Sequence, residues 1–235
     1  MLTISKNSMN NSSKSIALLF VASLSAPLCF AGEAIIFDQP GLIGFRDGSS
    51  VSGLYDSRNA KFSCSFLFTE DRGKSDAKNV DDYIATPLLT FVLGEKSPSF
   101  SSRNKAFDIK ANLYRREDEW VIQTEAGQAG CENATGTFTF GPKDYRSVSY
   151  RVTQQVPAIG IRIAKGKTIF YDNRGGKFIA RKSYLVYGDG VVALKAQGDF
   201  SYIRYVGAGP RGEGRITFGW VRTADLVDPF PEGAE

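Results

Sequence analysis

Short runs in which apolar and polar residues alternate recur along most of the chain, and this two-residue period is the strongest constraint on its fold. Residues 50–55 and 61–68 are the clearest examples. Such alternation is typical of β-strands that bury one face and expose the other. Further runs of this kind cover 107–114, 120–124, 135–140, 147–153 and 158–164.

Glycine-containing turns separate these runs, for example at Asp47-Gly48, at 173–176 and at 188–190. The 24 glycines and 17 phenylalanines fit many short strands joined by tight turns. Only residues 76–85 suggest a short helix, and residues 94–106 suggest a polar loop. We therefore predict an all-β protein.

Residues 1–31 have the composition of a secretory signal peptide. Lys6 and Lys14 precede an apolar run that begins at Ile16, and small residues follow up to Ala31. The apolar run is about 15 residues long and contains serine and proline, whereas a membrane-spanning helix needs about 20 apolar residues. We expect cleavage after Ala31 and a periplasmic or secreted protein that does not span a membrane.

Cleavage of this segment leaves two of the three cysteines, Cys64 and Cys131. An even number of cysteines in an exported chain predicts a disulfide, here Cys64–Cys131. Loss of Lys6 and Lys14 also lowers the formal net charge from +4 to +2. So small an excess of positive charge argues against a nucleic-acid partner.

Three sequence motifs lie near the C-terminal end: the two strand-like runs of 182–194 around Gly188-Asp189-Gly190, the run 198–206, and the Gly-Trp-Val…Leu pattern of 219–226. Together and in this order they resemble the bacterial SH3-like domain. The resemblance implies a small SH3-like β-barrel over residues 166–230. Members of that family often accompany cell-wall enzymes or bind peptide and peptidoglycan.

Residues 32–165, which hold both cysteines, then form a separate disulfide-tied N-terminal β domain. Their composition and layout resemble small periplasmic β-barrels and β-sandwiches such as lysozyme inhibitors and immunity proteins. The fold we expect is thus an N-terminal β-barrel or β-sandwich, followed by a small SH3-like barrel.

The chain contains no histidine. This excludes Ser-His-Asp triads, Cys-His dyads and histidine-ligated zinc or haem. Acidic residues are adjacent to one another at 70–71, 81–82 and 117–119. Adjacent acids in turns point apart, whereas a glycosidase needs two carboxylates opposed across a cleft. We expect a protein that is not an enzyme and has no catalytic residue, metal site or cofactor.

The SH3-like region holds more aromatic residues than a small core requires. If Ile203 and Trp220 face inward, alternation places Tyr202 outward and Arg204 on the same side. Tyrosine and arginine are common anchors of interfaces, although these tyrosines could equally be ordinary half-buried strand residues. The glycine-rich stretch 207–215 is either a binding loop or a slack hairpin. The candidate binding surface comprises Tyr184, Tyr187, Tyr202, Arg204, Tyr205, Arg211 and Arg215.

These features together favour an exported, non-enzymatic binding protein. We expect a protein partner, such as a toxin or hydrolase that the chain blocks as an inhibitor or immunity protein. The alternative is a cell-wall-associated module that binds peptidoglycan through its SH3-like domain.

Overall fold

The computed structural model of the chain describes residues 32–71, 73, 77–207 and 214–232. The signal peptide expected at 1–31 and the candidate residue Arg211 lie outside this part of the chain. Strands make up 57% of the structure and helices 7%, which confirms the all-β prediction. None of the described helices is long and apolar enough to cross a membrane.

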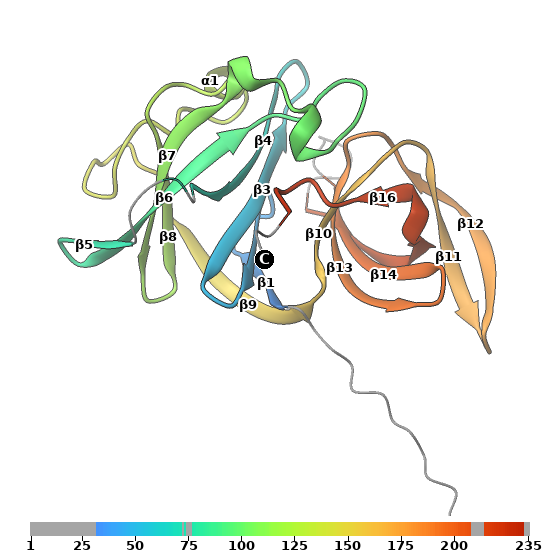
Figure 1. The fold of residues 1–235 in the computed structure, drawn as a ribbon. Coiled ribbons are helices and arrows are strands. Elements are labelled where there is room, and N and C mark those ends of the chain that lie inside the picture. Colours follow the sequence, from blue (N-terminus) through green and yellow to red (C-terminus); the bar gives the residue numbers. More distant parts are fainter. Residues whose placement is uncertain (1–31, 72, 74–76, 208–213, 233–235) are drawn as a thin grey trace, which may run out of the picture.

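The N-terminal sheet has nine strands in the order β4-β3-β2-β1-β9-β8-β7-β6-β5. An additional pairing of β4 with β6 closes eight of them into a barrel, and β5 extends from β6 outside that ring (Figure 1). The strands are β1 (Gly32–Phe37), β2 (Leu42–Asp47), β3 (Ser50–Arg58), β4 (Ser63–Glu70), β5 (Lys78–Val80), β6 (Tyr83–Phe91), β7 (Ile109–Arg116), β8 (Glu119–Thr124) and β9 (Tyr150–Ala158).

The C-terminal sheet has seven strands in the order β12-β11-β15-β14-β13-β10-β16 and curves into a half-barrel. Its two edges are therefore β12 and β16 (Figure 1). The strands are β10 (Gly160–Ala164), β11 (Thr168–Arg174), β12 (Lys177–Leu185), β13 (Gly190–Gln197), β14 (Phe200–Val206), β15 (Ile216–Arg222) and β16 (Leu226–Val227), with a short 3-10 helix, η3 (Thr223–Asp225), before β16.

Glycines with left-handed backbone angles form the tight turns of both sheets. Gly48 has φ +57° in the turn between β2 and β3, and Gly175 and Gly176 have φ +60° and +86° between β11 and β12. Non-glycine residues adopt such angles only with strain. The turns predicted at Asp47-Gly48 and at 173–176 are confirmed.

The helix suggested at 76–85 is wrong, because the described part of this segment folds as β5 and the start of β6. Asp81, with φ +53°, and Asp82 form the tight turn between these strands. Aspartate tolerates this backbone conformation better than most residues. The weak helical pattern therefore came from two antiparallel strands and the turn between them.

Residues 135–140 do not form the expected strand. They follow a single helical turn, α1 (Cys131–Ala134), in the long connection from β8 to β9. This connection joins the sheet through isolated hydrogen bonds, such as that from the Thr124 N–H to the Phe138 carbonyl at 2.8 Å. The polar loop expected at 94–106 is present and contains two short 3-10 helices, η1 (Phe100–Ser102) and η2 (Lys105–Phe107).

The sulfur atoms of Cys64 and Cys131 lie at disulfide-bonding distance, as predicted. Cys64 belongs to β4 and Cys131 to α1, and both residues are buried. The pair therefore fixes the β8–β9 connection to the barrel wall. A hydrogen bond between the Tyr55 and Thr135 hydroxyls, 2.8 Å long, joins the same two regions.

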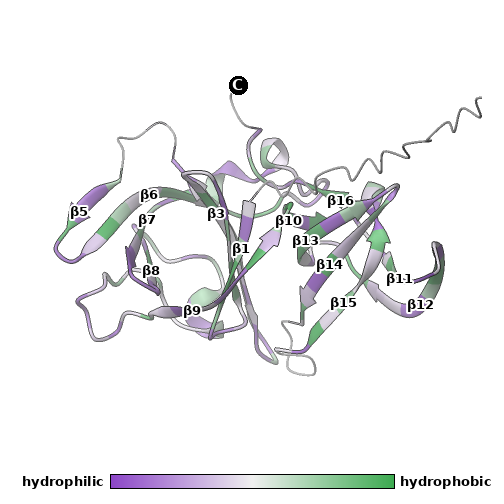
Figure 2. Cartoon of the chain, turned by 90° about the horizontal axis from the view of Figure 1, so that it is seen from below, coloured by the Kyte–Doolittle hydropathy of each residue, from purple (hydrophilic) through white to green (hydrophobic). Residues whose placement is uncertain are grey.

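Three apolar clusters form the core. One fills the barrel, around residues such as Phe66 and Trp120, and another lines the inner face of the half-barrel, around residues such as Ile203 and Val221. The third lies between the two sheets and is called the junction core here. It contains Ala34, Ile36, Ile43, Phe45, Leu54, Leu67, Phe91, Ala158, Ile161, Ile163 and Val192. The barrel and half-barrel thus share buried apolar surface, and they lie side by side in Figure 2.

The change from one sheet to the other occurs at Ile159, whose N–H donates to the Ala193 carbonyl at 2.7 Å. The following strand, β10, pairs with β13 and β16 of the half-barrel. The boundary expected between 165 and 166 therefore falls one strand after the change of sheet. Only one apolar residue joins β9 to β10. The sequence therefore contains no polar or glycine-rich linker that would mark the boundary.

Strand β9 has an outer edge that is only partly paired. Tyr150 and Arg151 pair with β8, whereas residues 154–157 pair with β1 alone among the described strands. A β-bulge opposite Ile36 and Phe37 and the residue Pro157 interrupt this stretch. Bulges and prolines are common devices that keep strand edges from pairing with other chains.

Candidate functional site

Six aromatic side chains form a continuous surface on the outer side of the half-barrel, called the aromatic face here. Its members are Tyr171, Phe178, Phe200, Tyr202, Phe218 and Trp220. The rings of Phe178 and Phe200 stack with centroids 3.8 Å apart and planes only 10° apart. Trp220 lies 5.5 Å from Phe178 and 5.2 Å from Tyr202. The face therefore runs unbroken across four strands.

Strand register creates this face. Tyr171 lies directly opposite Trp220, and Trp220 directly opposite Tyr202. Residues that are directly opposite point to the same side of a sheet, so the three rings share one surface. Their chain neighbours Phe170 and Ile203 point to the other side, into the core of the half-barrel.

The expected inward orientation of Trp220 is therefore wrong, although that of Ile203 is confirmed. Trp220 is only 8% exposed, but neighbouring rings of the outer face cover it. A buried tryptophan in this position supports the more exposed rings around it instead of filling the core.

Two cations lie at the rim of the aromatic face. The Lys195 Nζ atom is 5.3 Å from the Tyr202 ring centroid and 5.5 Å from that of Trp220, and the Arg222 guanidinium is 5.7 Å from that of Phe200. Lys195 is directly opposite Tyr202 on β13. Cations over ring faces hold the rings and offer positive charge to a ligand.

Of the candidate residues from the sequence, only Tyr202 belongs to the aromatic face. Tyr184 lies on β12 and is 53% exposed, with Lys167 Nζ 4.9 Å from its ring centroid. Tyr187 donates a hydrogen bond to the Gly94 carbonyl of the barrel. Arg215 is exposed at the start of the β15 hairpin, where its carbonyl accepts from the Gly207 N–H at 3.0 Å.

Arg204 does not contribute to an exposed binding surface, contrary to expectation. Alternation places it on the same side of β14 as Tyr202, yet it is only 9% exposed. Its partner on β13 is Val192, which belongs to the junction core. The barrel covers the half-barrel here, so alternation gave the correct side but not the accessibility. Burial lowers the pKa of Arg204.

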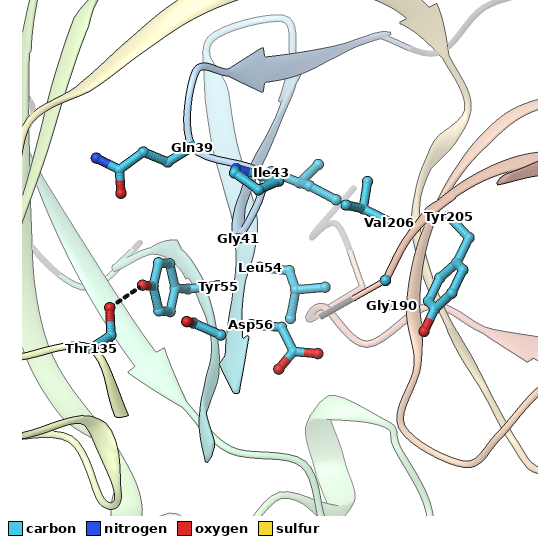
Figure 3. Close-up of a pocket in the computed structure, with 13 residues that line it drawn as sticks. Gln39, Gly41, Ile43, Leu54, Tyr55, Asp56, Thr135, Gly190, Tyr205 and Val206 are labelled. Carbon is cyan, nitrogen blue, oxygen red and sulfur yellow. Dashed lines mark hydrogen bonds between the residues drawn. The ribbon is translucent and has the colours of Figure 1, made fainter. Parts of the chain in front are cut away.

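The last candidate, Tyr205, lies at a pocket between the two sheets (Figure 3). The pocket has a volume of about 300 Å³. Tyr55 points from the barrel toward Thr135, and the Asp56 carboxylate points toward the half-barrel. Apolar side chains such as Ile43 and Val206 complete the lining. The barrel thus contributes both polar and apolar groups to the pocket, and the volume of the pocket fits only a small molecule.

A cluster of ionisable groups lies beside this pocket. Arg58 binds both carboxylate oxygens of Asp56, at 3.1 and 2.8 Å. Asp189 is only 6% exposed; it accepts from the Val186 N–H at 2.8 Å and from the Tyr205 hydroxyl at 3.4 Å. Burial raises the pKa of both carboxyl groups, and it raises the pKa of Tyr205 to about 12. These groups satisfy one another, which suits a structural role at the junction.

Replacement of Asp189 by asparagine is expected to stabilise the protein at neutral pH, by less than about 2 kcal/mol. The amide oxygen can accept from the Val186 N–H, and the amide nitrogen can donate to Tyr205. Because the pKa of Asp189 is raised in the folded state, ionisation costs stability as pH rises through that pKa. The variant's advantage should therefore disappear as pH falls toward 4.

Urea denaturation of both proteins at several pH values measures this difference. A variant that is less stable than the original at pH 7, with the gap widening at higher pH, would contradict the prediction. Such a result would mean that the attraction of Asp189 to Arg58 exceeds the cost of its burial.

A wider groove of about 890 Å³ lies on another side of the junction. Its lining combines hydroxyl groups with apolar residues such as Phe45 and Phe230. The charged pair in the groove, Arg162 and Asp228, is joined at 2.9 Å. The groove is also lined by the hydroxyl groups of Ser50, Ser52, Thr69, Ser99 and Ser101, and by two further acidic residues, Asp47 and Glu232.

Within the described residues, no group of three or more histidine, cysteine, aspartate or glutamate side chains could hold a metal ion. Of the acidic residues 117–119, Glu117, with φ +51°, and Asp118 form the turn between β7 and β8, and Glu119 begins β8. Glu119 accepts hydrogen bonds from Arg116 at 2.7 Å and from Tyr83 at 3.1 Å. These acidic residues thus form and stabilise the β7–β8 hairpin.

Comparisons with known proteins add no relative: no family model, curated protein or solved structure matches the chain.

Sequence reasoning recognised the excess of aromatic residues but not the surface that they form. The missing information was the register of β11 against β12. Counting outward from the Gly175-Gly176 turn pairs Asn173 with Phe178 and thereby orients both strands. That turn was visible in the sequence, so this part of the face could have been found.

Proposed function

We propose that this chain is an exported, non-enzymatic binding protein that recognises another protein through the aromatic face. The observation that carries the proposal is the continuous set of rings on the outer side of the half-barrel, away from its core. Soluble proteins rarely expose large contiguous apolar surfaces without a binding role. Tyrosine, tryptophan and arginine also dominate the energetics of protein interfaces.

The half-barrel presents these rings on a curved, strand-supported surface, not in a cavity. Such a surface suits a macromolecular partner better than a small molecule, which is usually enclosed by its site. A disulfide-tied exported protein of this kind would act as an inhibitor or immunity protein that covers part of a toxin or hydrolase.

Capture experiments with matched variants test this proposal. The immobilised protein should retain a stoichiometric partner from a periplasmic extract or culture medium. Phe200→Ala combined with Tyr202→Ala should lower the affinity at least about 100-fold, as expected for two interface anchors. Tyr145→Ala is the control, because Tyr145 is 93% exposed on the barrel and lies outside the face.

Circular dichroism and thermal unfolding establish that the double variant remains folded. Retention of the same partner by the folded double variant would refute the role of the aromatic face. Equal loss in the Tyr145→Ala control would show that the captured protein binds elsewhere.

Binding to peptidoglycan is the second candidate, and the exposed ring of Phe218, at 44%, favours it. Exposed ring faces can pack against the apolar faces of sugar rings. Sedimentation with purified sacculi tests this alternative. Co-sedimentation that the Phe200→Ala and Tyr202→Ala double variant abolishes would favour the cell wall as ligand; absence of co-sedimentation removes it.

A further inference from the structure

Strand β12 is an edge of the half-barrel along its whole length. It pairs with β11, and none of the described residues pairs with its other side. In Figures 1 and 2 it lies at the end of the half-barrel farthest from the barrel. An unpaired edge presents backbone N–H and C=O groups that can pair with an added strand.

The hairpin geometry identifies the outward-facing groups. Arg174 and Lys177 are opposite each other and flank the two-residue turn Gly175-Gly176. Residues that flank such a turn form a hydrogen-bonded pair, and successive residues then alternate. The backbone groups of Lys177 and Ile179 therefore point toward β11, and those of Phe178 and Ala180 point outward.

The charge along this edge is positive. Strand β12 contains Lys177, Arg181 and Lys182 and no acidic residue. The Arg181 guanidinium forms a salt bridge with Asp172, and it donates a hydrogen bond of 2.9 Å to the Phe218 carbonyl. The two lysines are exposed and form no salt bridge within the described residues. Lysines on an edge oppose indiscriminate pairing, yet they attract a strand of opposite charge.

The edge is also continuous with the aromatic face. Phe178 belongs to both, because its outward backbone groups lie on the edge while its ring stacks on Phe200. A strand added beside β12 would place every second side chain on the same side of the sheet as the Phe178 ring. Its remaining side chains would lie on the opposite side, which is the side of Lys177 because that residue is the chain neighbour of Phe178.

We propose that β12 is the docking edge for an extended, acidic segment of a protein partner, which adds to the half-barrel as a further strand. This proposal rests on the proposed function, since it assigns the partner segment that the aromatic face would contact. Backbone pairing supplies the geometry, the net positive charge of the edge favours acidic segments, and Phe178 selects an apolar side chain between the acids.

A synthetic peptide of alternating glutamate and valine, blocked at both ends, is the probe for this edge. Isothermal titration calorimetry should detect its binding, and the matched lysine–valine peptide should not bind. Amide hydrogen exchange at Phe178 and Ala180 should slow about tenfold or more in the complex, as expected for newly paired amides. Exchange at Ile179, which already faces β11, should change much less.

Ala180→Pro removes an outward N–H and leaves the hairpin bonds to β11 in place. It should weaken binding of the acidic peptide about tenfold or more, whereas Ala180→Val, which keeps the N–H, should bind normally. An acidic peptide with N-methylated valines provides a second measurement that does not depend on the variant's folding; it should not bind.

Three results would overturn the proposal: no binding of the acidic peptide, equal binding of both peptides, or full binding by the folded Ala180→Pro variant. Its failure is distinguishable from that of the proposed function. If the peptide fails but the Phe200→Ala and Tyr202→Ala variant still loses the captured partner, the aromatic face stands and the strand-addition mode falls. If the peptide binds as expected and that variant keeps its partner, the strand-addition mode stands and the role of the aromatic face falls.

Discussion

Replacing Cys64 and Cys131 together with alanine is expected to lower the free energy of unfolding by about 4 kcal/mol. The disulfide closes a loop of 67 residues, and in the chain-entropy model a loop of this length removes about that much freedom from the unfolded chain. The loss is large because typical domains are stable by only about 5–15 kcal/mol. The connection between β8 and β9 should be the first region to loosen, since Cys131 attaches α1 to β4.

Urea denaturation of the oxidised protein and of the double alanine variant measures this effect. Reductant should destabilise the original protein by a similar amount and leave the variant unchanged, which serves as the internal control. Free thiols at Cys64 and Cys131 in protein purified without reductant, detected by mass spectrometry, would contradict the prediction.

Phe91→Ala should destabilise the whole molecule by about 3–5 kcal/mol, the usual range for a buried phenylalanine. Phe91 is 0% exposed in the junction core. Its ring contacts Phe100 at 5.1 Å and Phe230 at 6.4 Å, from two different segments of the chain. The cavity left by this substitution would therefore weaken the packing between the barrel and the half-barrel.

The two tryptophans allow each sheet to be observed separately, because Trp120 lies in the barrel and Trp220 in the half-barrel. In variants that keep one tryptophan each, with the other replaced by phenylalanine, both signals should show the same unfolding midpoint. Phe91→Ala should lower both midpoints together. Phe62→Ala is the matched control, since Phe62 is 44% exposed, and it should cost less than about 1 kcal/mol.

Separate midpoints for the two tryptophans would contradict this prediction. They would show that the barrel and half-barrel unfold as independent units in spite of their shared core.

The sequence allowed the strands and the main turns to be predicted, because alternation and turn glycines are local signals. Residues 50–55 lie in β3 and residues 120–124 in β8, as expected. The disulfide could also be predicted, since the cleavage expected after Ala31 would leave only Cys64 and Cys131 to pair.

The prediction failed where the outcome depends on contacts between distant strands. Arg204 is on the predicted side of β14 but is covered, because the barrel packs against that part of the half-barrel. Trp220 faces outward because its register with Tyr202 places both rings on one side. Neither the packing of one sheet on the other nor the register of β15 against β14 can be read from a short sequence window, because residues 207–215 separate these two strands.

The interrupted edge of β9 has a consequence for how molecules of this protein meet one another. Residues 154–157 carry no charge, so like-charge repulsion would not keep two such edges apart. The bulge and Pro157 protect the edge in its place, by interrupting the regular ladder of donors that a neighbouring molecule would need. Concentrated solutions should for this reason resist self-association through β9, and replacement of Pro157 would remove one of these two protections.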